Sequence, residues 1–200
     1  MYEKLHEIVM YLDYTAWYYL NSVWHNNVLD AIIPFFRNQW TWAPLYLFLL
    51  VFMLKNFGYK GLMWCVFFLA TFALSDQLSA HLMKPIFMRV RPCNNPELAG
   101  IVHNIVPCGS GYSFPSSHAA NHFSLGIFSA ITLGFLSKWI RYVAVLWALS
   151  VAYAQVYVGV HFPLDVTVGG ILGAAVGIIT ARLFLLKFDL SAIRLVKSQA

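Results

Sequence analysis

The sequence predicts an all-α integral membrane protein: a bundle of five or six transmembrane helices with interfacial helices at its N-terminus. Two observations lead to this fold class. Of the 200 residues, 60% are hydrophobic and only 10% are charged, whereas a soluble domain is usually about 25% charged. The apolar residues also gather into stretches that approach the ~20 residues a helix needs to cross the hydrocarbon of a bilayer.

Five of these stretches are candidate spans. In chain order they cover residues 40–55, 61–83, 117–137, 139–159 and 164–186. The first is the weakest candidate, because it is short and contains Pro44. The preceding segment, 1–38, mixes apolar and charged residues, which is typical of helices lying in the membrane interface. A sixth span made from residues 8–24 is the alternative.

The chain is interpreted as one domain, 1–200, with interfacial helices over 1–38 and a transmembrane core over 39–187. One long polar segment, 84–116, interrupts the apolar pattern. It is rich in proline and holds the run Gly109-Ser110-Gly111, so it is expected to form loops. The net charge of +5 is spread over short loops without a basic stripe, and nucleic acid is therefore not expected as a partner.

Three short clusters of polar residues lie next to the spans. The first, Lys84 to Pro92, follows the second span. The second, Pro115 to His118, opens the third span, and the third, His161 to Asp165, lies between the fourth and fifth. Two crossings separate the second cluster from the third, so all three clusters are expected on the same side of the membrane.

The distribution of positive charge orients that side. The side opposite the clusters carries Lys55, Lys60, Lys138, Arg141, Lys187, Arg194 and Lys197. The cluster side carries Lys4, Arg37, Lys84, Arg89 and Arg91. Because cytoplasmic loops carry the excess of Lys and Arg, the clusters are expected on the periplasmic or extracellular face of the inner or plasma membrane.

The third cluster holds a candidate nucleophile. A neutral imidazole such as that of His161 can attack phosphorus, and a carboxylate on its other ring nitrogen would stabilise the cation that forms. Asp165 lies four residues later, a spacing that can place both side chains on one face near a helix start. The alternative is an interfacial histidine followed by a helix-capping aspartate.

The second cluster places Ser116, Ser117 and His118 at a helix start. Free backbone amides there attract an anion, and His118 could donate a proton to a departing oxygen. The alternative is an ordinary serine N-cap. In the first cluster, Lys84 and Arg91 supply two cations for a phosphate. Snorkelling toward the interface is the alternative, and it suits Arg89 best.

The three clusters together resemble the motifs of the type 2 phosphatidic acid phosphatase superfamily. The first motif, Lys, six residues, then Arg-Pro, matches Lys84, Arg91 and Pro92. The second motif, Pro-Ser-Gly-His, matches residues 115–118, with Ser117 in place of the glycine. The third motif is Ser-Arg, five residues, His, three residues, Asp. Its His and Asp match His161 and Asp165, but Ala154 and Gln155 stand where the family has Ser-Arg. The resemblance covers about 61–186.

The resemblance implies a membrane enzyme that hydrolyses a lipid phosphate. His161 would form a phosphohistidine supported by Asp165, and His118 would protonate the leaving group. Substrate-binding roles would fall to Lys84, Arg91, Ser116, Ser117 and Gln155. Neither a metal nor a cofactor is implied. An isoprenoid (undecaprenyl) diphosphate is favoured as substrate, and lipid A or phosphatidylglycerol phosphate is the alternative; the oligomeric state is left open.

Gln155 is the serious departure, since the family has an arginine there that would contact phosphate. Glutamine can donate hydrogen bonds but brings no charge, and loss of one preorganised donor can cost ~100–1000-fold in rate. Another cation, such as Arg89, could compensate. A catalytically weakened lipid-binding or transport protein is the rival from another class.

Two further patterns have structural consequences. Cys93 and Cys108 lie in one loop on the expected non-cytoplasmic side, where a disulfide can form; two unpaired cysteines are the alternative. Gly169, Gly170, Gly173 and Gly177 form a stripe of small residues on the last span, which indicates close helix packing.

Overall fold

The computed structural model describes residues 2–191, and over that range it contains helices and loops without a strand. The predicted all-α class is confirmed. The longer helices are α1 (Tyr2–Trp17), α2 (Asn27–Arg37), α3 (Ala43–Asp76), α5 (Ser117–Leu133), α6 (Lys138–Tyr157) and α7 (Pro163–Lys187). The shorter elements are η1 (Tyr18–Val23), η2 (Gln39–Trp42), η3 (Gln77–Met83), α4 (Lys84–Phe87), η4 (Pro92–Asn94) and η5 (Pro96–Leu98).

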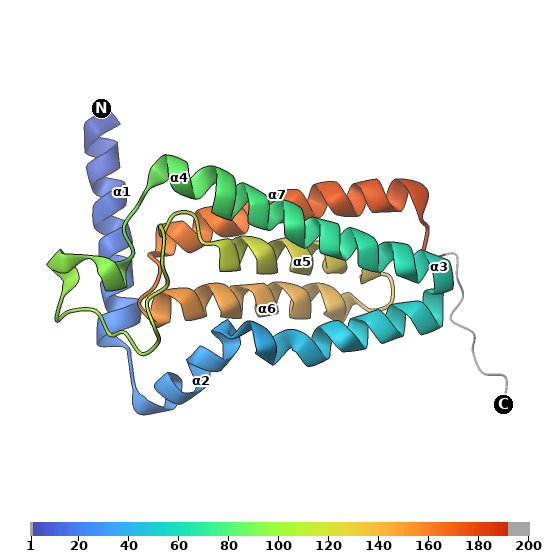
Figure 1. Cartoon of the computed structure of the whole chain (residues 1–200), viewed down its shortest axis with the longest axis horizontal. Coiled ribbons are helices and arrows are strands. Elements are labelled where there is room, and N and C mark those ends of the chain that lie inside the picture. The colour runs from blue at the N-terminus through green and yellow to red at the C-terminus, as the bar shows by residue number, and fades with distance from the viewer. Residues whose placement is uncertain (1, 192–200) are drawn as a thin grey trace.

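Helix α3 contains a sharp reversal that turns it into an antiparallel hairpin (Figure 1). Gly58 makes the turn with φ 52°, a left-handed conformation that glycine adopts without a Cβ clash. At Gly61 the returning arm passes the backbone of Met53 so closely that a Cβ would lie 2.0 Å from the Met53 carbonyl oxygen. The two arms correspond to the first two predicted spans, and η3 and α4 extend the second arm to Phe87.

Helices α5 and α7 pack backbone to backbone at the centre of the bundle. A Cβ at Gly169, Gly173 or Gly177 would lie 2.5, 2.1 and 2.5 Å, respectively, from a carbonyl oxygen of α5 or its cap. The close packing that the glycine stripe predicts is therefore confirmed. It also joins the two helix starts, because the Ser116 amide donates to the Asp165 carbonyl oxygen at 3.0 Å.

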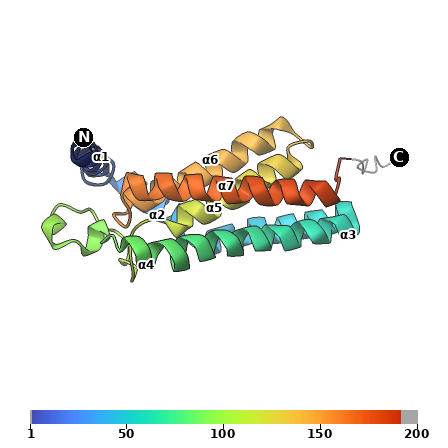
Figure 2. The ribbon, with the colours of Figure 1, turned by 90° about the horizontal axis from the view of Figure 1, so that it is seen from above.

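Helix α1 lies across one end of the bundle. It runs vertically in Figure 1, where the bundle is horizontal, and Figure 2 shows it end-on. Its last residue, Trp17, is fully buried against Phe162, Val156 and Leu98. This orientation disfavours the alternative of a sixth span over 8–24, since such a span would lie along the other helices.

Three stretches of the described chain are long and apolar enough to cross a membrane: Gln39–Phe87, Lys138–Tyr157 and Pro163–Lys187. The first of them contains both arms of the α3 hairpin. Helix α5 has 17 residues and is the most enclosed helix, packing against α3, α6 and α7. The number of crossings stays a prediction.

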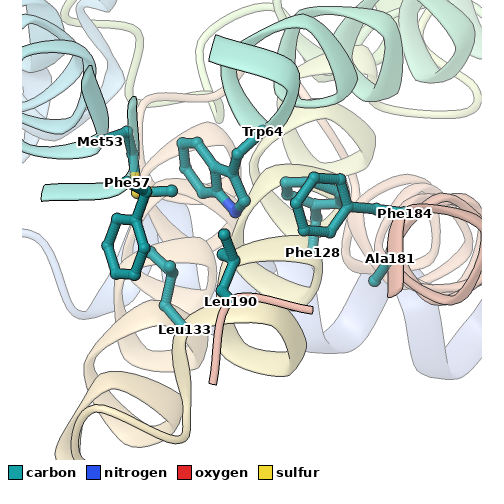
Figure 3. Close-up of a cluster of buried hydrophobic side chains, with 8 residues drawn as sticks. All are labelled: Met53, Phe57, Trp64, Phe128, Leu133, Ala181, Phe184 and Leu190. Atoms are coloured by element: carbon teal, nitrogen blue, oxygen red, sulfur yellow. The ribbon is translucent and has the colours of Figure 1, made fainter. Parts of the chain in front are cut away.

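The end of the bundle near Gly58 is filled by aromatic and aliphatic side chains (Figure 3). The buried members of this aromatic core are Met53, Phe57, Trp64, Phe128, Leu133, Ala181, Phe184 and Leu190. Its one polar atom of note, the Trp64 indole Nε1, donates to the Thr132 hydroxyl at 2.7 Å, so the ring is buried without losing its hydrogen bond. Lys55, Lys60 and Lys138 lie at this same end, whereas Arg194 and Lys197 fall outside the described residues.

Candidate active site

The structure brings the three sequence clusters together at the end of the bundle opposite Gly58. The start of α5, the start of α7 and the loop after α4 meet there (Figure 1). Polar side chains are buried at this end, among them Arg91, Ser113, Ser116, Gln155, His161 and Asp165. The topological expectation that all three clusters share one face is therefore met in the fold.

His161 follows a tight turn after α6. Gly159 makes this turn with φ 81°, and the His161 amide donates to the Gln155 carbonyl oxygen at 3.2 Å. The imidazole is only 2% exposed. Burial lowers the pKa of His161 to about 4, against the raising influence of Asp165, so the ring is neutral at pH 7.

The two ring nitrogens of His161 have different partners. Nε2 lies 3.2 Å from Nη1 of Arg91, and a guanidinium can only donate. Nε2 is therefore unprotonated and accepts this hydrogen bond, and the proton resides on Nδ1. Nδ1 lies 3.4 Å from Oδ2 of Asp165 and 3.3 Å from the hydroxyl of Ser113. This is the tautomer that a nucleophilic Nε2 requires.

Asp165 fulfils both functions considered for it from the sequence. Its Oδ2 accepts from the Phe162 amide at 2.8 Å and so caps α7, while the same oxygen approaches His161. Ser113 also donates to Oδ2. Ser113 is a site residue that the sequence did not reveal, because a serine in a Gly-Tyr-Ser loop has no distinctive spacing.

Arg91 is held above the imidazole by main-chain acceptors. Its Nη1 donates to the Val160 carbonyl oxygen and its Nε to that of Gly111, each at 3.2 Å. Lys84, at the start of α4, donates to the Tyr112 carbonyl oxygen at 2.8 Å. Both cations of the first cluster therefore line the loop that covers His161, rather than extending away into the interface.

The start of α5 supplies the second cluster. The Ser116 hydroxyl caps the helix by accepting from the Ala119 amide at 3.4 Å, so the N-cap alternative describes its side chain correctly. The amides of Ser117 and His118 follow in the first turn, where no helical acceptor exists for them, an arrangement that binds anions. The buried Ser117 hydroxyl has no hydrogen-bond partner among residues 2–191.

Arg89 does not behave as the sequence suggested. Its guanidinium donates to Oδ1 of Asp165 at 2.7 Å and to Oδ2 of Asp13 at 2.5 Å, and it lies over the Phe162 ring at 4.1 Å. Only 17% of its side chain is exposed. The expectation that Arg89 snorkels is therefore wrong. Its pairing with two carboxylates disfavours the hypothesis that it replaces the missing family arginine.

A different arginine reaches the position of the missing one. Arg37, the last residue of α2, donates from Nε to Oε1 of Gln155 at 3.2 Å. Gln155 is fully buried on α6. The sequence showed Arg37 only as a charge on the same side of the membrane as the clusters, and nothing in its local pattern indicated a partner 118 residues away.

An apolar groove leads away from the site. It has a volume of about 630 Å³ and lies between the two arms of α3 and α5. Its lining includes Tyr46, Leu50, Phe68 and Phe72 from the arms, with His118 and Ser117 at its polar end. Leu47 and Leu69, on the same lining, are 62% and 66% exposed, so the groove opens on the outer, apolar side of the bundle.

A model of the PAP2 superfamily matches residues 62–189, which include all three motif clusters. The chain belongs to the PAP2 superfamily. The predicted resemblance is thereby confirmed, and with it the enzyme class of a membrane lipid phosphatase. The residues that the PAP2 model matches begin after Arg37.

Among PAP2 relatives, lipid A 4'-phosphatase of Bacteroides thetaiotaomicron is 33% identical over 84% of this chain and 74% of its own length. Undecaprenyl-diphosphatase of Sulfolobus acidocaldarius is 30% identical over 82% of this chain and 73% of its own length. The solved structure of a PAP2-type phosphatidylglycerolphosphate phosphatase from Bacillus subtilis covers 92% of this chain and 89% of that one, with a TM-score of 0.69 and 23% identity. That structure supports the fold alone.

Proposed function

We propose that this PAP2 protein removes phosphate from a membrane lipid through a phosphohistidine on His161. The observation that carries the proposal is the buried, neutral imidazole of His161, with Nε2 beside Arg91 and Nδ1 backed by Asp165. A carboxylate on one ring nitrogen and a guanidinium at the other suit a ring that must first donate a lone pair and then carry a positive charge.

The residues divide the reaction into two balanced steps. The Nε2 lone pair of His161 attacks phosphorus, the bond from phosphorus to the lipid oxygen breaks, and protonated His118 donates a proton to that oxygen. Burial lowers the pKa of His118 to about 3 in the free site, so this step requires the negative charge of the bound phosphate to favour the protonated ring. Asp165 stabilises the imidazolium while Lys84, Arg91 and the first-turn amides hold the phosphate oxygens. A water molecule then attacks phosphorus, His118 takes its proton, and inorganic phosphate leaves.

The groove supports a lipid as the substrate. Its apolar lining ends at His118 and Ser117, so a hydrocarbon tail in the groove would place its phosphate at the start of α5. We infer that a phosphate ester of lipid A is the first candidate, because a lipid A 4'-phosphatase is 33% identical. An isoprenoid diphosphate is the second, on the likeness to undecaprenyl-diphosphatase. The rival of a binding or transport protein rests on Gln155 alone.

The site is proposed to face the periplasm or the extracellular space. Two observations support this side. Lys55, Lys60 and Lys138 lie at the opposite end of the bundle, as expected for cytoplasmic loops. The loop beside the site joins Cys93 to Cys108 in a disulfide, a bond that persists in oxidising compartments.

The test is phosphate release by the purified protein in detergent, without added divalent metal and with a chelator present. A panel of lipid A phosphates, isoprenoid diphosphates and glycerolipid phosphates would identify the substrate. We expect His161→Ala to lower the rate at least ~1000-fold, and His6→Ala, which removes an exposed histidine on α1, to leave it unchanged. Normal activity of the His161→Ala variant would rule out the proposed nucleophile.

A further inference from the structure

The position of the missing family arginine is occupied by a buried amide with one unused donor. Gln155 is 0% exposed. Its main-chain carbonyl oxygen accepts a hydrogen bond from the His161 amide, so Gln155 is adjacent to the proposed nucleophile. Its side-chain Nε2 has no hydrogen-bond partner among the described residues. A buried N–H group without a partner carries an energetic cost, which a phosphate oxygen would relieve.

Arg37 brings a positive charge to this amide from a helix that precedes the residues matched by the PAP2 model. Its Nε donates to Oε1 of Gln155 at 3.2 Å. A guanidinium has five N–H donors, and within the part of the chain that the structure describes, this is the one hydrogen bond of the Arg37 side chain. Arg37 also forms none of the ion pairs found among those residues. Its two terminal amino groups have no hydrogen-bond partner among residues 2–191.

Helix α2, which ends at Arg37, is docked on α6. Asn26 caps its first turn, accepting from the amides of Val28 and Leu29. Ile33 is buried in a hydrophobic cluster with residues of α6. The hydroxyl of Tyr157, two residues beyond Gln155, donates to Asp30 of α2 at 2.7 Å. Arg37 ends this helix and is thus carried by a backbone that is docked on the helix of Gln155.

Two guanidinium groups are linked to His161, Arg91 by contact with its imidazole and Arg37 through Gln155. Arg91 contacts the imidazole directly. Burial and, after it, the positive charge of Arg37 lower the pKa of Arg91. Like charges in a half-buried region repel, and an anion between them turns that repulsion into attraction. A phosphate group on its way to His161 is such an anion.

We propose that Arg37 supplies the phosphate-binding charge that other members of the superfamily carry at the position of Gln155. Gln155 is a positioning residue that orients the Arg37 guanidinium through Oε1 and adds its own Nε2 donor. The charge has moved from α6 to α2, while its location beside the reacting phosphorus is kept. This inference rests on the proposed phosphatase function and identifies a further substrate-binding residue for it.

The experiment is a charge swap. We expect Arg37→Ala to lower kcat/KM about 100-fold and to weaken competitive inhibition by inorganic phosphate about tenfold. Arg37→Lys, a point charge without the planar fork, should recover a small part of the loss. The double variant Arg37→Ala with Gln155→Arg should regain at least tenfold over Arg37→Ala. Arg182→Ala, which removes an exposed arginine from the far part of α7, is the matched control and should behave like the wild type.

The double variant distinguishes a phosphate-binding role of Arg37 from a structural one. If Arg37 only stabilised the fold, an arginine on another helix would not restore activity. Failure of Gln155→Arg to rescue, or wild-type phosphate inhibition in Arg37→Ala, would overturn the proposal. Direct binding of inorganic phosphate to the same variants is measured alongside, by calorimetry. If no lipid is hydrolysed, the proposed function fails, while loss of phosphate binding in Arg37→Ala and its return in the double variant would still support the assigned contact.

Discussion

The two ends of the bundle are built from different interactions. The end near Gly58 is the aromatic core, in which Trp64 and Phe184 pack on Phe128 with ring centroids 5.4 and 6.1 Å away. The opposite end buries a network of charges and hydroxyls around His161 and Asp165. Apolar burial is a large source of stability, whereas even paired buried charges add little, because the cost of their desolvation offsets their attraction.

This difference indicates that the aromatic core stabilises the bundle, while the polar end holds the residues of the proposed reaction. The glycine contact of α5 with α7 connects the two ends, and it aligns the helix starts at Ser116 and Asp165. Substitutions at the aromatic core should therefore change the free energy of unfolding, and substitutions at the polar end should change the rate. Three experiments test this difference between the two ends.

The largest effect is expected at Asp165. We expect Asp165→Asn to lower kcat about 10⁴-fold, because the amide no longer supports the Nδ1 proton or the imidazolium of His161. Asp13→Asn is the matched control, since Asp13 shares Arg89 with Asp165 but does not contact His161. Its rate should fall less than tenfold. Steady-state phosphate release measures both, and equal losses in the two variants would contradict a direct role of Asp165.

A smaller effect in free energy is expected at Phe128, which is fully buried in the aromatic core. We expect Phe128→Ala to lower the free energy of unfolding by about 3–5 kcal/mol, through lost contacts and the cavity left behind. Turnover per folded molecule should stay within about twofold. The control is Phe135→Ala, at the same end but 42% exposed. Unfolding in mixed micelles gives the measurement, and a selective loss of turnover would show that the two ends are coupled.

The smallest of the three effects is expected for the disulfide. Cys93 and Cys108 are 15 residues apart. We expect Cys93→Ser, which removes the disulfide, to lower the free energy of unfolding by about 3 kcal/mol, as the chain-entropy model gives for a loop of that length. Cys65→Ser, which removes the free cysteine of α3, is the control. Thiol labelling from outside intact cells, with and without reductant, tests the bridge and the proposed face together. Labelling of the loop only from the cytoplasmic side would refute that face.

Much of the site was predictable because it is local in sequence. Motif spacing and a count of spans were enough to bring Lys84, Arg91, His118 and His161 to one end of the bundle. The glycine stripe predicted a close helix contact for a similar reason. Glycine in the middle of an apolar helix usually marks a place where another helix approaches closely.

The remaining site residues are set by long-range contacts that leave no local pattern. An arginine near the interface has the same sequence context whether it faces water, as assumed for Arg89, or two carboxylates, as observed. Arg37 and Gln155 are 118 residues apart, and the hairpin turn at Gly58 lies between them. Their contact depends on how α2 docks on α6, which requires the fold.

The groove that opens on the apolar flank has a kinetic consequence. A molecule that enters between the α3 arms approaches from within the bilayer, so its encounter with the enzyme is a search in two dimensions. The concentration that sets the rate is then the mole fraction of substrate among the surrounding lipids. Adding inert lipid or detergent at constant bulk substrate should slow such an enzyme as effectively as diluting a soluble one with water.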